Sequence, residues 1–286
     1  MHTIMILAAL AVAWNVRQSW SSTSGNWQHR WGQTLWFFLF PPLMLAIAGI
    51  SVLFMGTQGT MLGLSVGWYS YGLTVIGFVV AIALGIKLAW QGWRAVSQTR
   101  TYPQEQVEGV SCRVLETPVL FCALVGFWRP ELVVSQGLLY VLTPEQLAAA
   151  IAHEQAHYHY RDTFWFFWLG WIRTCTGWLP QTEALWEELL LLRELRADNR
   201  AAQQVDPLTL AESLLLVVRS AIVPMTSFCA AFSAASQTER LNERINALLE
   251  TSTLEPPTPS IQPRFNWSWL WLLLALLPLV TVPFHS

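Results

Sequence analysis

The residues best suited to chemistry lie together in His153-Glu154-Gln155-Ala156-His157. The two histidines are four residues apart, so on a helix their imidazoles share one face and can bind one cation. Glu154 is angled toward the same site without needing to bind the metal, which suits a general base. The motif therefore predicts a metal site with His153 and His157 as ligands. The alternative is an amphipathic helix whose polar groups face solvent, because so short a motif can arise by chance.

A carboxylate that would complete the site lies downstream, in Glu194-Leu195-Arg196-Ala197-Asp198. A catalytic zinc takes three protein ligands and keeps one position open, and two His with one Glu is a known set. Glu194 is therefore the predicted third ligand of one Zn²⁺ per chain. Asp198, one turn later, is placed to accept a proton from the far ring nitrogen of a ligand histidine. The alternative is that both acids pair with neighbouring arginines as surface helix charges.

Two helices must position these groups. Thr143 as N-cap, Pro144 at the first helical position and Gln146 completing a capping box predict a helix from there to about Tyr160. A second helix is expected from about Glu183 to Gln203. Asp206-Pro207 opens a further helix in the same way.

A small sheet is expected before the first of these helices, from residues 109 to 115 and 118 to 135. Val110, Cys112 and Val114 alternate there with more polar neighbours, which is typical of a half-buried strand. A substrate strand could add to the edge of this sheet.

The composition indicates a membrane protein. Hydrophobic residues make up 53% of the 286 residues and charged residues only 12%, against about 25% charged in an average soluble chain. A net charge of -2 offers no basic field for nucleic acid. We expect an N-terminal transmembrane region at 1–91, a zinc metallopeptidase domain at 92–250, a proline-rich linker at 251–263 and a C-terminal span at 264–286.

Within the N-terminal region the expected spans lie near residues 2–14, 35–56 and 61–90. The first is either a retained span or the core of a signal peptide, and the lack of Lys or Arg before it favours a retained span. Arginines at 17 and 30, and the bases after residue 86, place residues 15–34 and the region after 91 on the cytoplasmic side.

The aromatic segment 163–180 lies between the two site helices. If it crossed the membrane, Glu194 would lie on the other side from His153 and His157 unless the chain crossed back, and residues 181–193 are short and charged. We therefore expect an interfacial or re-entrant segment, with the active site near the cytoplasmic face of a cell inner (plasma) membrane.

The ordered series of motifs resembles a known family, the integral-membrane gluzincins of the BlaR type. The resemblance rests on Phe127 to Leu139, Leu142 to Leu147, the H-E-x-x-H helix through Arg161-Asp162, Trp178-Leu179-Pro180, and Glu194 to Asp198. It covers roughly residues 105–250. It implies zinc ligation by His153, His157 and Glu194, with catalysis by Glu154.

Two features limit this resemblance. Members that sense β-lactams carry Ser-x-x-Lys and Lys-Thr-Gly motifs, whereas the single lysine of this chain is Lys87. The chain resembles the shorter members without the penicillin-binding sensor, which are thought to act on a cytoplasmic repressor. The related HtpX-like quality-control peptidases share H-E-x-x-H and the downstream glutamate.

The expected fold is mainly α: a multi-pass membrane protein with a zincin-like helical metallopeptidase domain and a small β-sheet inserted between transmembrane spans. The expected function is a membrane-bound zinc metalloendopeptidase that hydrolyses a cytoplasmic or membrane-proximal protein, and the expected partners are that substrate and the lipid bilayer. The alternatives are an HtpX-like quality-control protease, a non-catalytic zinc-dependent signal transducer, or a structural membrane protein with a chance motif. For an oxyanion donor the candidates are Tyr158, His159, Arg240 and Arg244, and the sequence singles out none of them.

Overall fold

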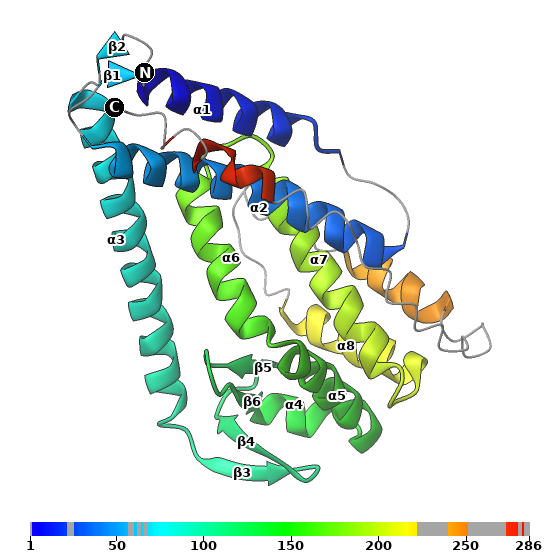
Figure 1. The fold of residues 1–286 in the computed structure, drawn as a ribbon. Helices are drawn as coiled ribbons and strands as arrows, with labels where there is room; N and C mark the ends of the chain where they lie inside the picture. Colours follow the sequence, from blue (N-terminus) through cyan, green and yellow to red (C-terminus); the bar gives the residue numbers. More distant parts are fainter. Residues whose placement is uncertain are drawn as a thin grey trace, which may run out of the picture. The chain divides into compact units, whose positions relative to one another are not determined.

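The computed structural model describes residues 2–21, 26–56, 60–61, 64–65, 68–221, 240–250, 273–279 and 282. It is mainly helical with a small mixed sheet (Figure 1). The chain divides into two compact units: residues 1–88, 168–192 and 262–286 form one, and residues 89–167 and 193–261 form the other. The domain bounds expected from the sequence, including 92–250 for the peptidase domain, stay predictions.

The first unit contains three apolar helices, α1 (His2–Gln18), α2 (Trp27–Met55) and most of α3 (Trp68–Thr99). By length and composition α2 and α3 could each cross a membrane, and α1 is a shorter apolar helix. The helix α2 begins earlier than the expected 35, because the Asn26 side chain caps it by accepting the Gln28 N–H. The helix α3 begins later than 61, because the short strands β1 (Thr60–Met61) and β2 (Leu64–Ser65) pair first.

Two arginines link helices within this unit. Arg17 of α1 is fully buried and donates to the Phe38 carbonyl and to Thr182 Oγ1. Arg30 of α2 lies 2.7 Å from Glu188 Oε1, with both side chains largely buried. Thr182 and Glu188 belong to the first half of α7 (Thr182–Ala201). Both arginines therefore make specific interhelical contacts in addition to the charge that the orientation rule counts.

The second unit contains a four-stranded sheet of β3 (Gln104–Val107), β4 (Val110–Leu115), β5 (Cys122–Val125) and β6 (Glu131–Ser135). Its order is β3-β4-β6-β5, with β4 and β6 parallel and the other pairs antiparallel. β5 is therefore one edge of the sheet. The sequence located β4, β5 and β6 within the expected ranges but not β3, whose four residues are too polar to show an apolar alternation.

Helices α4 (Gln136–Val141) and α5 (Pro144–Tyr160) pack on the sheet through a shared apolar core. The capping box is present: Thr143 Oγ1 accepts the Gln146 N–H, and Gln146 Oε1 accepts the Thr143 N–H. The helix α5 ends at Tyr160, its C-cap Arg161 has a left-handed φ of 54°, and α6 (Asp162–Thr176) begins at the next residue. This sharp corner changes the chain direction directly after the H-E-x-x-H motif.

The remaining helices of this unit are the second half of α7, α8 (Pro207–Ala221) and a helical segment at 240–250. Asp206 caps α8 by accepting the Thr209 N–H, as its sequence predicts. The predicted linker and most of the predicted final span lie outside the described residues. Within that span, residues 273–279 are described and form a 3₁₀ helix. Those two assignments, and the interfacial placement of residues 163–180, stay predictions.

Candidate metal centre

Three side chains from two helices meet at one point in the second unit. His153 and His157 come from α5, and Glu194 comes from α7. The two Nε2 atoms are 3.1 Å apart, His153 Nε2 is 3.3 Å from Glu194 Oε2, and His157 Nε2 is 3.7 Å from Glu194 Oε1. Their ligand atoms form a group that could hold a metal ion.

The spacing of these atoms fits a tetrahedral zinc site. Zn–N and Zn–O distances of about 2.0–2.1 Å put two ligands at tetrahedral corners about 3.3–3.4 Å apart. The three observed separations of 3.1, 3.3 and 3.7 Å bracket that value. Both histidines are buried and the Glu194 side chain is only 19% exposed. The donor set and its geometry therefore fit the metal that the sequence predicts.

Each histidine has its own carboxylate behind it. His153 Nδ1 lies 2.8 Å from Asp198 Oδ1, and His157 Nδ1 lies 2.7 Å from Asp162 Oδ2. A carboxylate at Nδ1 keeps the ring proton on that side and leaves Nε2 free to bind metal. Asp198 was expected near a ligand histidine, whereas the sequence did not single out Asp162.

Two arginines hold these carboxylates in place. Arg244, from the 240–250 helix, donates from Nε and Nη2 to the two Asp198 oxygens at 2.7 and 2.9 Å. Its Nη1 also lies 3.4 Å from Glu194 Oε2. Arg196 of α7 pairs with Asp162. The Arg244 guanidinium is thus committed to carboxylates here, which does not favour it as an oxyanion donor.

The charges around the site shift the pKa values of its groups. Burial alone would lower the pKa of His153, but Asp198 and Glu194 raise it to about 10. The pKa of His157 is raised as well, since Asp162 and Glu194 outweigh burial. Burial would raise the pKa of Glu194, but Arg244 and the two imidazoles hold it well below its usual range. The site thus favours positive charge at the imidazoles, where a cation would compete with protons.

Glu154 lies next to this group and close to the edge of the sheet. Its Oε2 accepts the backbone N–H of Leu124 in β5 at 3.2 Å. Burial raises the pKa of this carboxyl, and the two nearby imidazoles oppose that rise. A carboxylate with a raised pKa is better matched to taking up and giving back a proton near neutral pH.

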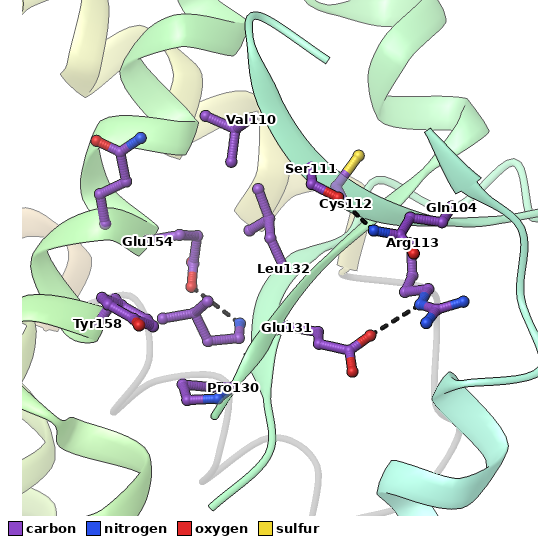
Figure 2. Close-up of a pocket in the computed structure, with 12 residues that line it drawn as sticks. Gln104, Val110, Ser111, Cys112, Arg113, Pro130, Glu131, Leu132, Glu154 and Tyr158 are labelled. Carbon is purple, nitrogen blue, oxygen red and sulfur yellow. Dashed lines mark hydrogen bonds and ion pairs between the residues drawn. The ribbon is translucent and has the colours of Figure 1, made fainter. Parts of the chain in front are cut away.

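A cavity of about 420 Å³ opens beside Glu154. In Figure 2, Glu154 and Tyr158 from α5 lie on one side of it and the ion pair of Arg113 with Glu131 lies on the other. Tyr158, an oxyanion candidate from the sequence, therefore reaches the same space as Glu154. The other candidates, His159 and Arg240, do not line this cavity.

Three side chains that could hold a metal ion, with the half-buried Glu154 beside them, form an arrangement that suits a hydrolase. The family described as Peptidase family M48 matches residues 113–240. This range includes the sheet strands β5 and β6, the H-E-x-x-H helix and Glu194. The match supports the M48 metallopeptidase family and so a metallopeptidase, a class of hydrolase. A comparison with curated proteins finds no match for the chain.

Proposed function

We propose that this protein is a membrane-bound zinc metalloendopeptidase that cleaves a cytoplasmic or membrane-proximal protein. The observation that carries the proposal is the convergence of His153, His157 and Glu194 within reach of a single ion, with Glu154 beside them. His153, His157 and Glu194 would hold the zinc, and Glu154 would be the catalytic base. A zinc ion bound there supplies Lewis acidity, which makes water a nucleophile near pH 7 and polarises a carbonyl.

The protein's own groups then have separate tasks. Glu154 takes a proton from the attacking water and later delivers it to the leaving amine. The Leu124 N–H holds Glu154 Oε2, so the carboxylate keeps one orientation while its other oxygen exchanges the proton. Asp198 and Asp162 keep the two imidazoles oriented through their Nδ1 atoms. Burial of these carboxylates keeps water from competing for them.

The edge strand β5 is the proposed docking place for substrate backbone. Leu124 is in register with Leu132 of β6, yet its N–H is donated away from the sheet to Glu154. The outer edge of β5 thus faces the catalytic helix. A peptide that added to this edge would extend past Glu154, and its side chains could enter the adjoining cavity.

The sequence resemblance and the apolar helices support the proposed substrate and location. The short BlaR-type members suggest a cytoplasmic repressor as the substrate, and an HtpX-like role in membrane protein quality control is the alternative. Two helices long and apolar enough to cross a membrane support attachment to a bilayer. The proposed active site lies near the cytoplasmic face of the inner membrane.

The direct test is zinc stoichiometry together with proteolysis, measured on the purified full chain in detergent. We expect about one zinc in the wild type and in Glu154→Gln, and much less in Glu194→Ala, because three ligands are needed for a stable site. Glu187→Ala, an exposed acid on the same helix, is the control and should keep the metal. Cleavage of an unstructured protein should be lost in Glu154→Gln and Glu194→Ala but not in Glu187→Ala. A wild type that binds no zinc after reconstitution would overturn the proposal.

A further inference from the structure

An aromatic cluster adjoins the candidate site in the second unit. Five rings form it, from the β5–β6 turn and the first turns of α6, and we call them the aromatic patch: Phe127, Trp128, Phe164, Trp165 and Phe167. Phe127 lies 5.0 Å from both Phe164 and Phe167, and Trp128 lies 5.2 Å from Phe164, measured between ring centroids. The patch is therefore one contiguous surface made by two segments far apart in sequence.

The patch displays its largest rings instead of burying them. Trp128 is 76% exposed and Trp165 is 57% exposed. The turn that presents Trp128 requires glycine at position 126, because Gly126 has a φ of 138° and a side chain there would meet Pro130 Cα at 2.8 Å. Exposed apolar surface that is contiguous indicates a docking surface.

The charges around the patch indicate what docks there. Exposed Arg129 lies in the first segment, and exposed Arg161 lies directly before α6. The nearest acids are paired, Glu131 with Arg113 and the buried Asp162 with Arg196. No acidic residue occurs in residues 119–130 or 163–176. Tryptophan with flanking arginine suits the headgroup layer of a bilayer, where an indole meets both apolar and polar surroundings and anionic lipid attracts the base. The candidate spans α2 and α3 show that the same chain has other segments suited to a bilayer.

The patch adjoins the site through both of its segments. Leu124, which donates to Glu154, lies three residues before Phe127 on the same hairpin. Asp162, which contacts His157 Nδ1, lies two residues before Phe164. A surface that holds the aromatic patch would therefore lie beside the groups that hold the metal and the base.

We propose that the aromatic patch docks into the headgroup layer of the lipid bilayer, so that the active site accepts polypeptide presented at the membrane surface. The substrate class is then the juxtamembrane segment of a membrane-attached protein. This part of the inference rests on the proposed peptidase function, whereas the docking of the patch does not.

The test places nitroxide labels on the full chain in vesicles of phosphatidylcholine and phosphatidylglycerol. Cysteine is introduced by Trp128→Cys or Trp165→Cys after the four native cysteines are replaced by alanine, and zinc content confirms that each variant is folded. Gln106→Cys is the control, because Gln106 is exposed on β3 at the opposite edge of the sheet. Power saturation then compares collisions with oxygen, which enriches in lipid, and with a water-soluble nickel chelate.

We expect both patch labels to favour oxygen in vesicles and the Gln106 label to favour the nickel chelate. Patch labels that collide with the nickel chelate as freely as the Gln106 label would overturn the docking. Labels shielded from both reagents, in detergent as well as in vesicles, would also overturn it and indicate a protein partner or a second copy.

Cleavage assays separate this inference from the proposed function. Trp128→Asp should slow cleavage of a vesicle-tethered peptide on the order of tenfold, the factor expected when a large aromatic ring loses its apolar surroundings. Cleavage of the same peptide, soluble and in detergent, should stay within about twofold of the wild-type rate. Equal rates for wild type and variant on the tethered peptide would contradict the substrate assignment. If neither peptide is cleaved by the zinc-loaded wild type, the peptidase function fails, and the label depths still decide the docking.

Discussion

Asp162 offers the sharpest single test of the metal centre, because its two oxygens serve two different donors. Oδ2 lies 2.7 Å from His157 Nδ1, and Oδ1 accepts from the Arg196 guanidinium. The residue is only 3% exposed. When His157 holds the metal through Nε2, its proton is on Nδ1, so both neighbours of Asp162 are donors. In Asp162→Asn the amide keeps the shape but has one acceptor and one NH₂ group, so in either orientation the NH₂ meets a donor. One of the two buried contacts must therefore be lost.

The expected loss in zinc affinity follows from that geometry. Removing the group that orients a ligand histidine lowers metal affinity by about 10- to 100-fold, which is about 1.4–2.7 kcal/mol. We expect this range for Asp162→Asn, measured by competition with a chelator of known affinity on the detergent-solubilised chain. Asp198→Asn should also weaken zinc binding, because Asp198 Oδ1 lies 2.8 Å from His153 Nδ1 and both of its oxygens accept from Arg244.

The matched control is Asp206→Asn. It makes the same chemical change at an exposed helix cap, where asparagine caps as well as aspartate does. Its zinc affinity should equal that of the wild type. The reasoning is refuted if Asp162→Asn, with its fold intact, binds zinc as tightly as the wild type, or if Asp206→Asn weakens binding to the same extent.

Three further outcomes are expected. Arg244→Met should destabilise the zinc-free protein by about 3–5 kcal/mol, because it leaves buried carboxylates without their cation. Thermal unfolding in the presence of a chelator measures this loss, and Arg240→Met on the same helix is the control and should show a much smaller effect. Leu124→Pro should keep zinc but lower kcat/KM, and the acidic limb of its pH–rate profile should move to higher pH, since the lost N–H had lowered the pKa of Glu154. Leu124→Ala keeps that N–H and is the control, and an acidic limb that moved to lower pH in Leu124→Pro would contradict the assignment. Because carboxylates raise the pKa of His153 to about 10, zinc binding at pH 7 should release protons, and zinc affinity should rise with pH. Calorimetry in buffers of different ionisation enthalpy measures the proton release, and an affinity independent of pH would be inconsistent with a histidine ligand.

The sequence predicts best where geometry is local to one helix. His153 with His157, and Glu194 with Asp198, are four residues apart, and the α-helix alone puts each pair on one face. The cap at Thr143 is equally local, since it needs only side chains within one turn. That the two helices bring His153, His157 and Glu194 together required the chemical argument that zinc needs a third ligand.

The sequence predicts less where a contact depends on a turn or on a distant segment. Asp162 faces His157 because Arg161 adopts a left-handed conformation, which is uncommon for a residue other than glycine and has no pattern in the sequence. Arg244 is 46 residues from Asp198. The sequence offers Arg244 only as one of four candidate oxyanion donors, because a solvated surface charge gives the same sequence signal as a buried carboxylate partner.

Counting charged residues predicts membrane burial least well for the segment 181–193. By that count its acidic residues make the segment too polar to return through a membrane. Glu188 is not a free charge, because Arg30 pairs with it and both side chains are about 90% buried. Glu183 pairs with Arg173, although both stay exposed. A hydropathy count assigns each charge its full cost of leaving water, whereas a paired and hydrogen-bonded charge has recovered part of it. The depth of α7 in a bilayer therefore depends on which of its charges are paired. The pairing of Glu188 with Arg30 weakens the argument that the charges of residues 181–193 keep this segment out of the membrane.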